Sequence, residues 1–527
     1  MRKILIRSGI SPLETFDPTR IIFNNSIGGN VGNLIYAYSI YRTLTTENTK
    51  IVPDYYKIDP EQAEQINSEY DCYVIPLADA FREQFIPQLK KYTALINKLT
   101  IPVYVIGVGL RAPFEPDLDK GFPFDDAVKG FVKAVLNKSQ MIGVRGEITA
   151  QYLSKLGFKE GIDHTVIGCP SMYTFGRDLQ IRDTIITKES KIAVNSSKLS
   201  PDNVLDFITR SMKEYPNHYF IPQWLKEMLI VYLGASSLPN PTDNYPSKMS
   251  DNVYLEGRVP FFLNAQTWID FLKGVDLSFG ARLHGNITAT IAGTPSILLP
   301  KDARMRELAE YHQLTHVSAD KLTNETRLED LIESVDFHSP EKVQGVNFDK
   351  FISFLDRNGI DHIYKDSLNP ETIPLDSHLK NISLLPPIFP ITACSNEELI
   401  NRFETYYPEL DKRNNKKEKD LKDKLKNAET KNKLTTKELK DVKDALVDTK
   451  AELVDTKDAL KTQHEKLKLT ELKLKDTNNL LSTSRTELDE ATSNINIKNK
   501  ALKQHEKTIQ RRSVQLAIKT ADLLRRK

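Results

Sequence analysis

The sequence predicts an α/β protein with two doubly wound, mostly parallel sheets, followed by a long C-terminal helical rod. Short apolar runs alternate with amphipathic stretches over residues 1–390, and the series starts afresh near Lys191. Through residues 415–527 an apolar residue instead recurs at every seventh position. A chain of 527 residues is also too long for one ordinary core, so we expect separate domains.

The first series of runs predicts an N-terminal α/β domain over residues 1–185. Helical periodicity fills the stretches 34–44 and 147–156, between runs that have the length of buried strands. The strand-sized runs are residues 21–23, 72–75, 103–106, 141–144 and 165–167.

The second series predicts a C-terminal α/β domain with closing helices over residues 186–390. Its strand-sized runs are residues 191–195, 219–221, 277–279 and 296–299. Ligands of open α/β sheets bind beyond the carboxyl ends of the strands. We therefore expect a ligand cleft between the two domains.

A linker over residues 391–414 and a coiled coil over residues 415–527 complete the predicted domains. No Pro, Gly, Trp or Phe occurs from Asp411 to Lys527. A strict heptad favours supercoiling and a homo-oligomer joined through the rod, while a solvated single helix stays open as the alternative. The heptad positions, broken only by Asn432, are Leu425, Leu439, Leu446, Leu453, Leu460, Leu467, Leu474, Leu481, Leu488, Ile495, Leu502, Ile509, Leu516 and Leu523.

Composition limits the classes of partner. The chain has 73 Lys and Arg against 71 Asp and Glu, and it has no aromatic and basic patch in the rod, which disfavours nucleic-acid binding. Three unevenly spaced cysteines, together with the lack of a secretory or membrane-spanning apolar stretch, indicate a cytoplasmic protein. The basic tip at 511–527 is either a plain solvated end or a contact for an anionic membrane surface.

A glycine-rich loop, Gly28-Gly29-Asn30-Val31-Gly32-Asn33, precedes the first long amphipathic helix. Glycines allow a tight turn, and a helix start attracts anions, so Asn30, Gly32 and Asn33 are candidate substrate-binding residues. The alternative is a purely structural turn in which Asn33 caps the helix.

Arg145 follows the apolar run at 141–144, where an expected strand ends and a helix begins. An arginine at this point faces the ligand crevice and can bind a carboxylate or a phosphate with two parallel hydrogen bonds. A salt bridge to Glu147 is the structural alternative.

The most informative segment is Phe279-Gly280-Ala281-Arg282-Leu283-His284-Gly285. Here a strand stops, and an arginine and a histidine stand two apart between glycines. His284 can move a proton near neutral pH, whereas Arg282 stays charged and holds an anion, so both are candidate catalytic residues.

The next expected loop adds Lys301 and Arg304 as candidate substrate-binding residues. Adjacent parallel strands bring their carboxyl-end loops side by side, so this basic turn can complete an anion site around His284. A solvated helix start is the alternative. No metal-ligand pattern is visible, and we expect neither a metal nor a cofactor.

Four motifs in this order resemble the polysaccharide pyruvyl transferase family. They are Asn30-Val31-Gly32-Asn33, Val144-Arg145-Gly146-Glu147, Arg282-Leu283-His284-Gly285 and Asp302-Ala303-Arg304. Asn33 and Cys169 stand where the family pattern often has Asp, and the change at position 33 leaves the identity of the acceptor open.

The resemblance implies two Rossmann-like domains arranged as in B-type glycosyltransferases. It also implies phosphoenolpyruvate as donor substrate and a sugar of a cell-surface polysaccharide or its precursor as acceptor, joined as a pyruvate ketal. By this resemblance His284 acts as acid and then base, and Arg282 and Arg145 hold the donor. Arg304 and the amides of the loop 28–33 stabilise the leaving phosphate.

Two other functions stay open at this point. A nucleotide-sugar-dependent glycosyltransferase has the same predicted fold and a basic cleft, although Glu256 is only a weak candidate for holding a ribose. In a non-catalytic scaffold the helical rod would be the functional part of the chain, but this function leaves Arg282 and His284 unexplained.

Overall fold

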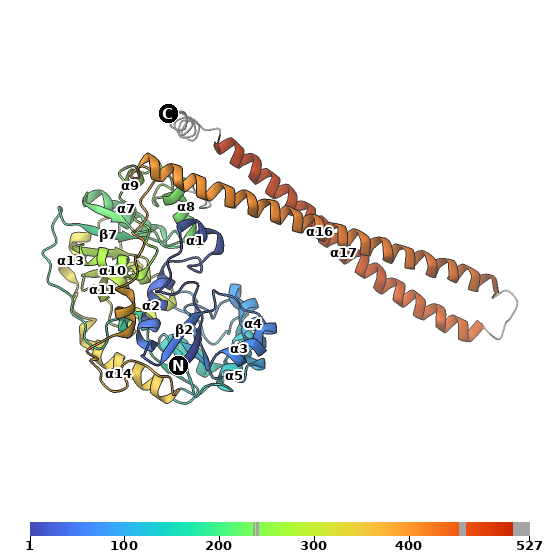
Figure 1. Ribbon diagram of the computed structural model, residues 1–527, viewed down its shortest axis with the longest axis horizontal. Coiled ribbons are helices and arrows are strands. Elements are labelled where there is room, and N and C mark those ends of the chain that lie inside the picture. The colour runs from blue at the N-terminus through green and yellow to red at the C-terminus, as the bar shows by residue number, and fades with distance from the viewer. Residues whose placement is uncertain (236–237, 239–241, 453–459, 510–527) are drawn as a thin grey trace. The chain divides into compact units, whose positions relative to one another are not determined.

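The computed structural model describes residues 1–235, 238, 242–452 and 460–509 (Figure 1). The chain divides into two compact units, Met1–Leu399 and Ile400–Lys527. The first unit contains all of the described strands. It is therefore the unit that holds the predicted site.

The N-terminal half of the first unit is a parallel sheet in the order β2-β1-β3-β4. Main-chain hydrogen bonds from Gly107 and Val108 to Gly143 join β4 to the parallel pair β5-β6. The strands are β1 (Arg2–Ile6), β2 (Thr49–Pro53), β3 (Cys72–Pro76), β4 (Val103–Ile106), β5 (Ile142–Val144) and β6 (His164–Val166).

The C-terminal half is a second parallel sheet, in the order β10-β9-β7-β8. When the strands of each half are counted along the chain, both sheets have the same spatial order: second, first, third, fourth. The strand order of such a sheet reverses between its first and third strands, and ligands bind at the carboxyl ends there. These strands are β7 (Ile192–Asn195), β8 (His218–Phe220), β9 (Leu277–Gly280) and β10 (Ser296–Leu298).

Amphipathic helices cover the N-terminal sheet. Leu89 and Tyr92 of α4 and Phe131 of α5 are fully buried in the same core as the strand residues Ile75 and Val105. The helices are α1 (Pro18–Asn24), α2 (Gly32–Leu44), η1 (Pro60–Gln62), α3 (Ala63–Glu69), η2 (Glu83–Phe85), α4 (Ile86–Lys98), α5 (Asp125–Leu136), α6 (Glu147–Lys155) and η3 (Pro170–Tyr173).

The helices after β7 cover the second sheet, and a late helix returns to the first half. Gln344 of α14 donates hydrogen bonds to the main chain of Met172 and Gly176, and Phe351 stacks on Tyr173 at 5.0 Å. The helices are α7 (Asp202–Glu214), α8 (Leu225–Leu233), α9 (Asn252–Leu255), α10 (Ala265–Lys273), α11 (Leu283–Ile291), α12 (Ala303–Tyr311), η4 (Ala319–Lys321), α13 (Leu328–Ser334), α14 (Glu341–Arg357) and α15 (Pro374–Leu379).

Two long helices, α16 (Asn396–Glu452) and α17 (Leu460–Ile509), make up most of the C-terminal region. Helix α16 begins inside the predicted linker at 391–414, so that segment is largely helical. The heptad positions Leu453, Leu516 and Leu523 and the basic residues from 511 onward lie outside the described residues.

Most of the predicted strands are present, with one error and two omissions. Residues 21–23 belong to α1 and not to a strand, because the Asp17 side chain caps the Arg20 N–H and Pro18 starts the helix. The prediction missed β1 and β2, whose apolar residues are few and adjoin charged ones such as Lys3 and Lys50.

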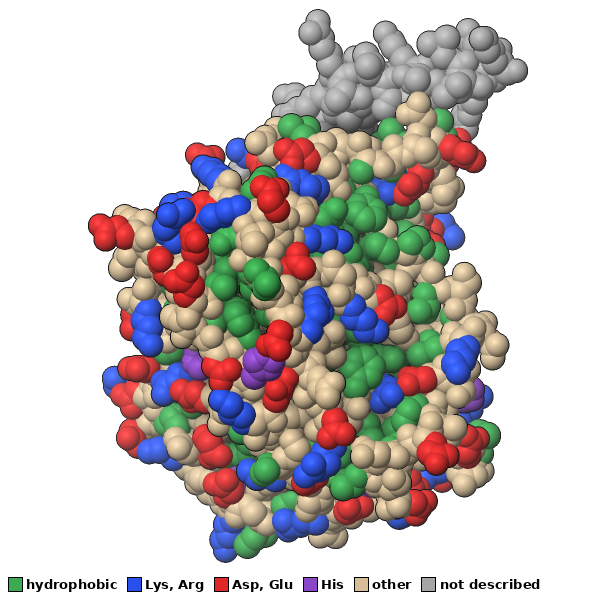
Figure 2. All heavy atoms as spheres, turned by 90° about the vertical axis from the view of Figure 1, so that its left-hand side faces the viewer, with side chains coloured by type: hydrophobic (Ala, Val, Ile, Leu, Met, Phe, Trp, Pro, Cys, Tyr) green, Lys and Arg blue, Asp and Glu red, His purple; other side chains and the backbone are tan. Residues whose placement is uncertain are grey.

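The face shown in Figure 2 carries acidic and basic side chains interspersed with each other, as expected from the balanced composition. Within the described ranges, none of the helices combines the length and the apolarity needed to span a bilayer.

Candidate active site

The predicted arginine and histidine lie at the carboxyl ends of β7 and β9, where the strand order of the second sheet reverses. Asn195 ends β7, and its Oδ1 accepts the Arg282 N–H at 2.8 Å. Gly280 ends β9 with φ +140°, and a Cβ there would lie 1.6 Å from the Asn195 carbonyl oxygen. Only glycine fits, so this contact fixes the start of α11.

His284 is buried in the first turn of α11. Its Nε2 lies 3.9 Å from Sγ of Cys169, and its ring lies 6.4 Å from that of Tyr36. A Cβ on Gly32 would approach the His284 Nδ1 to 2.7 Å, so the imidazole lies directly against this glycine. Burial, and then the charges of Arg145 and Arg304, lower the pKa of His284 well below its ordinary value. The imidazole is therefore neutral at neutral pH.

Arg145 is wholly buried and has unused donors. Its Nε donates to the Gly107 carbonyl at 2.6 Å, and its guanidinium lies over the Tyr36 ring at 4.8 Å. Neither NH1 nor NH2 has an acceptor among the described residues. The salt bridge to Glu147, the structural alternative, is not among the described ion pairs, and the buried guanidinium keeps a fork of donors that suits an anion.

Arg282 is held by the second half of the unit. Its Nε donates to the Ser196 carbonyl at 2.7 Å, its guanidinium lies 4.1 Å from the Trp224 ring centroid, and NH2 lies 3.6 Å from Glu227. Glu227 is fully buried, and it also accepts the Gln223 and Trp224 N–H groups. This scaffold orients Arg282 but leaves its NH2 without an acceptor at hydrogen-bond distance.

Lys301 and Arg304 follow β10, the strand beside β9, as the sequence predicted. Arg304 lies 3.4 Å from Asp79 and 3.6 Å from Asp302, and its Nε has no acceptor among the described residues. Nζ of Lys301 donates to Ser197 Oγ. Burial, followed by the charge of Arg282, lowers the pKa of Lys301 to about 7.

The glycine-rich loop plays a different part from the predicted one. Each N–H from Gly28 to Asn33 already has an acceptor inside the protein, so none is available to a leaving phosphate. The Asn33 side chain also turns inward, to the Ile27 carbonyl at 2.9 Å. The acceptors are the Asn25 carbonyl for Gly28, Asn25 Oδ1 for Gly29, the Ile27 carbonyl for Asn30, the Gln223 carbonyl for Val31, Asn30 Oδ1 for Gly32 and the Asn30 carbonyl for Asn33.

This loop instead joins the two halves. The Val31 N–H donates to the Gln223 carbonyl at 2.9 Å, and the Leu225 N–H donates to the Gly29 carbonyl at 3.0 Å. A β-bridge pairs Asn30 with Trp224. The loop therefore positions Gly32 against His284.

Glu307 is a buried carboxyl that sequence analysis missed. It accepts the Thr149 N–H and hydroxyl, both at 2.8 Å, and so ties α12 to α6 beside Arg145. Burial raises its pKa to about 7. A signal was present, since Glu307 stands among the apolar residues Met305, Leu308 and Ala309.

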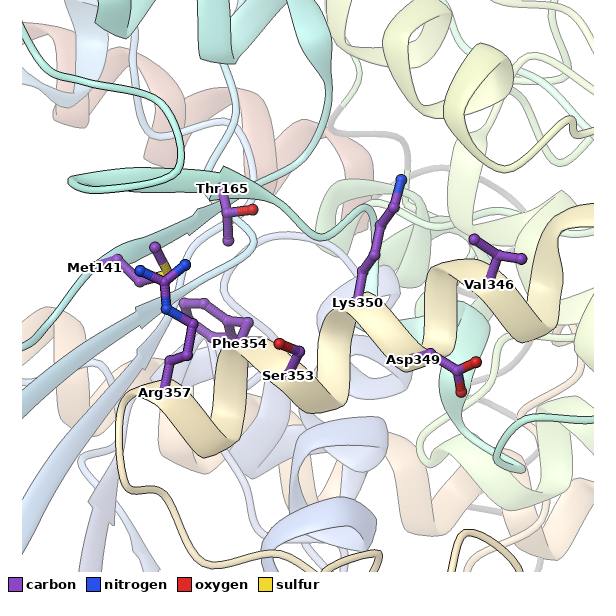
Figure 3. A pocket seen from close by; sticks show the side chains of 8 residues that line it. All are labelled: Met141, Thr165, Val346, Asp349, Lys350, Ser353, Phe354 and Arg357. Carbon is purple, nitrogen blue, oxygen red and sulfur yellow. The ribbon is translucent and has the colours of Figure 1, made fainter.

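A separate hollow lies along α14 (Figure 3). Its charged residues are engaged locally: Arg357 donates to the Gly161 carbonyl, and Asp349 pairs with Arg177. Met141, which also lines it, directly precedes β5, so the hollow lies by the amino end of that strand. None of the predicted site residues lines it.

Two further sequence hypotheses can be placed. Glu256, the candidate ribose ligand, is exposed and pairs with Arg258. Among the described residues, no group of three or more His, Cys, Asp or Glu side chains is placed to hold a metal ion.

Comparison with known proteins agrees with the motifs. Residues 30–302, more than half of the chain, match the sequence model of the polysaccharide pyruvyl transferase family. The chain belongs to this family. The matched range contains Arg145, Arg282, His284 and Lys301, while Arg304 lies two residues beyond it. In this pyruvyl transferase family member, the buried Arg282 and His284 thus lie within the matched range.

No curated protein matches this pyruvyl transferase family member, but solved structures do. An uncharacterised protein of Klebsiella pneumoniae is 14% identical and covers 59% of this chain and 88% of its own, with a TM-score of 0.33. The UDP-GlcNAc 2-epimerase of Neisseria meningitidis, bound to UDP-GlcNAc, is 13% identical and covers 68% and 100%, at 0.37. The glycosyltransferase SnogD of Streptomyces nogalater is 11% identical and covers 66% and 95%, at 0.28.

Proposed function

We propose that this protein transfers a pyruvyl group from phosphoenolpyruvate to two hydroxyls of a sugar, in a cell-surface polysaccharide or its precursor, and forms a pyruvate ketal. The observation that carries the proposal is a set of unused guanidinium donors at the loops that carry the predicted site residues. Arg145, Arg282 and Arg304 each have at least one buried N–H without an acceptor among the described residues. Phosphoenolpyruvate offers such a site a carboxylate and a phosphate.

Unpaired buried donors are expensive. A buried donor left without a partner costs about 1–3 kcal/mol, and more when it is charged. Three such arginines, of which Arg145 and Arg304 lie close enough to His284 to lower its pKa, therefore favour an anionic ligand over a solvated or structural role. Asp79 balances part of this charge: burial would raise its pKa, but Arg304, Arg82 and Arg111 lower it below its ordinary value.

The reaction needs one proton to reach C3 of the donor and two hydroxyl protons to leave the sugar. In the proposed sequence, one hydroxyl oxygen bonds to C2 while C3 gains a proton through His284. The second hydroxyl then bonds to C2, the bond from C2 to the phosphate oxygen breaks, and phosphate leaves with the remaining proton. Positive charge develops at C2, and the carboxylate held by Arg145 lies beside it.

Donor binding prepares His284 for this role. In the free protein Arg145 and Arg304 help to keep the imidazole neutral. A bound anion offsets those two cations, so it raises the pKa of His284 and allows the ring to take up a proton. Nε2 faces Cys169, and Nδ1 lies on the Gly32 side.

We further propose that the first unit has the two-domain layout of B-type glycosyltransferases and that the C-terminal helices form a coiled coil. The seam residues Leu474 and Leu481 are partly buried, whereas the off-seam Leu472 and Leu480 are 55% and 66% exposed. Because these exposures are those of a single chain, the difference fits a seam that packs within the chain. That the rod also joins copies of the chain into a homo-oligomer is a separate proposal, based on the heptad repeat. Peripheral association with polysaccharide assembly machinery at the membrane stays a proposal as well.

The test is phosphate release from phosphoenolpyruvate by the purified full-length protein, with a panel of nucleotide-linked and lipid-linked sugars. We expect release with one acceptor, its loss in His284→Ala, and a ketal in the product by NMR. Arg177→Met is the control, because Arg177 pairs with Asp349 at the protein surface. Tight binding of a nucleotide sugar without any release would favour a glycosyltransferase instead.

A further inference from the structure

The N-terminus of α11 has main-chain donors to spare. The structure records no acceptor among the described residues for the N–H groups of Leu283, His284 and Gly285. The N-cap residue, Arg282, makes no side-chain capping bond to them. Free N–H groups and the helix dipole together attract an anion. The neighbouring side chains decide whether such a site is built.

Gln223 supplies the first of these side chains. It is 1% exposed, and its Nε2 has no acceptor among the described residues. The same nitrogen lies 2.7 Å from the position that a Cβ on Gly285 would occupy. The amide is thus directed at the first turn of α11, and the glycine makes room for it. A buried, unpaired amide in this position indicates a missing ligand.

Two more donors come from the neighbouring strand ends. Ser196, directly after β7, is 2% exposed, and its hydroxyl has no partner among the described residues. Its carbonyl oxygen fixes Arg282 through Nε, and the Arg282 NH2, which lies 3.6 Å from Glu227, has no acceptor at hydrogen-bond distance. Lys301 adds positive charge nearby through its contact with Ser197. Unpaired donors on three separate segments therefore belong to residues that begin the first turn of α11 or contact it.

The chemistry of these donors differs from that of Arg145. The two free nitrogens of Arg145 form a planar fork, which matches the planar oxygens of a carboxylate. The donors around α11 instead combine main-chain N–H groups, an amide, a hydroxyl and a guanidinium from different elements. Such an arrangement suits the tetrahedral oxygens of a phosphate.

We propose that the first turn of α11, with Gln223, Ser196 and Arg282, binds the phosphate group of phosphoenolpyruvate, while Arg145 binds its carboxylate. This assignment rests on the proposed function for the identity of the donor. It adds Gln223 and Ser196 to the site and places His284, which belongs to the same helical turn, beside the bond that breaks.

Inorganic phosphate is the probe, because it tests the site without requiring turnover. Calorimetric titration of the full-length protein should give binding that weakens about tenfold or more in Gln223→Met, since one hydrogen bond to a charged ligand is lost. Ser196→Ala should weaken it in the same direction, and this variant removes no hydrogen bond within the described protein. The matched control is Gln266→Met, since the Gln266 amide is also unpartnered but lies on α10.

Competition then identifies the ligand. Displacement of phosphate by phosphoenolpyruvate, with the same order of affinities across the variants, supports the assignment. Unchanged phosphate affinity in both Gln223→Met and Ser196→Ala overturns the site. If phosphate affinity falls in both variants but phosphoenolpyruvate does not displace the phosphate, the site binds another phosphorylated ligand. That outcome overturns the donor assignment. If the binding results support the site but the protein transfers no pyruvyl group, the proposed function is wrong and the phosphate site stands.

Discussion

The Sγ atom of Cys169 lies 3.9 Å from Nε2 of His284, and both side chains are buried. Cys169 follows β6 in the first half, and His284 follows β9 in the second. The main-chain N–H of Cys169 donates to Nε2 of His312 at 2.8 Å, which fixes the loop that carries the thiol. The sulfur is therefore a positioned neighbour of the candidate acid and base.

Replacing this thiol should change the pH dependence of the reaction. In Cys169→Asp a carboxylate faces the His284 Nε2, so the pKa of His284 should rise. Because the protonated ring delivers the proton to C3, the basic limb of kcat/KM should move to higher pH by about one unit or more. Cys169→Ala should lower kcat about fivefold, since a hydrogen bond worth about 1 kcal/mol is lost. Cys72→Ala, another buried cysteine, is the control. An unmoved basic limb in Cys169→Asp would contradict this role.

Gly32→Ala should abolish most activity. The added Cβ would lie 2.7 Å from Nδ1 of His284 and 3.0 Å from its Cβ, so the imidazole must move. We expect at least a tenfold loss of kcat and about 1–3 kcal/mol lower unfolding free energy. Gly130→Ala is the control, because nothing lies within 4 Å of its added Cβ. Wild-type kcat in Gly32→Ala would mean that the position of this ring does not matter.

Glu307 should make stability depend on pH. Its folded pKa is about 7, above the ordinary 4.5, so the folded state binds more protons than the unfolded state between these values. Stability should therefore fall as pH rises through this window, by at most about 3 kcal/mol. Glu307→Gln removes this titration, so its stability relative to wild type should increase from pH 5 to pH 8 in urea denaturation. An equal difference at both pH values would refute the assignment.

The seam of α17 can be tested with neighbouring leucines. The pair Leu474→Lys and Leu481→Lys places charges on the partly buried seam, whereas Leu472→Lys and Leu480→Lys places them on the exposed surface. Light scattering should show a smaller assembly for the first pair only. Both pairs should keep wild-type transfer activity. Equal masses for the two double variants would argue against the coiled coil.

Much of the fold could be predicted because buried parallel strands are short continuous apolar runs. Such runs marked β3 to β10, and glycines beside charged residues marked the loops that carry Arg145, Arg282 and His284. The edge strand β2 escaped because it has few apolar residues. Helix α1 was mistaken for a strand because its apolar residues 21–23 are contiguous, which fits either structure.

The partners of the site residues could not be predicted in the same way. Glu227 and Arg282 are 55 positions apart in sequence and meet only because β8 and β9 flank β7. In the glycine-rich loop, the Val31 N–H is engaged because it donates to the carbonyl of Gln223, which lies in the other half. Local pattern identifies a charged residue at a strand end, but pairing across the fold decides which of its donors stay free.

The main-chain contacts between the glycine-rich loop and residues 223–225 have a consequence for how a substrate enters. A hinge motion that parted the two halves at this edge would break hydrogen bonds made by Val31 and Leu225. These bonds use peptide groups, so side-chain substitution does not remove them. A ligand of the candidate site therefore has to enter from a side other than the edge that these bonds close.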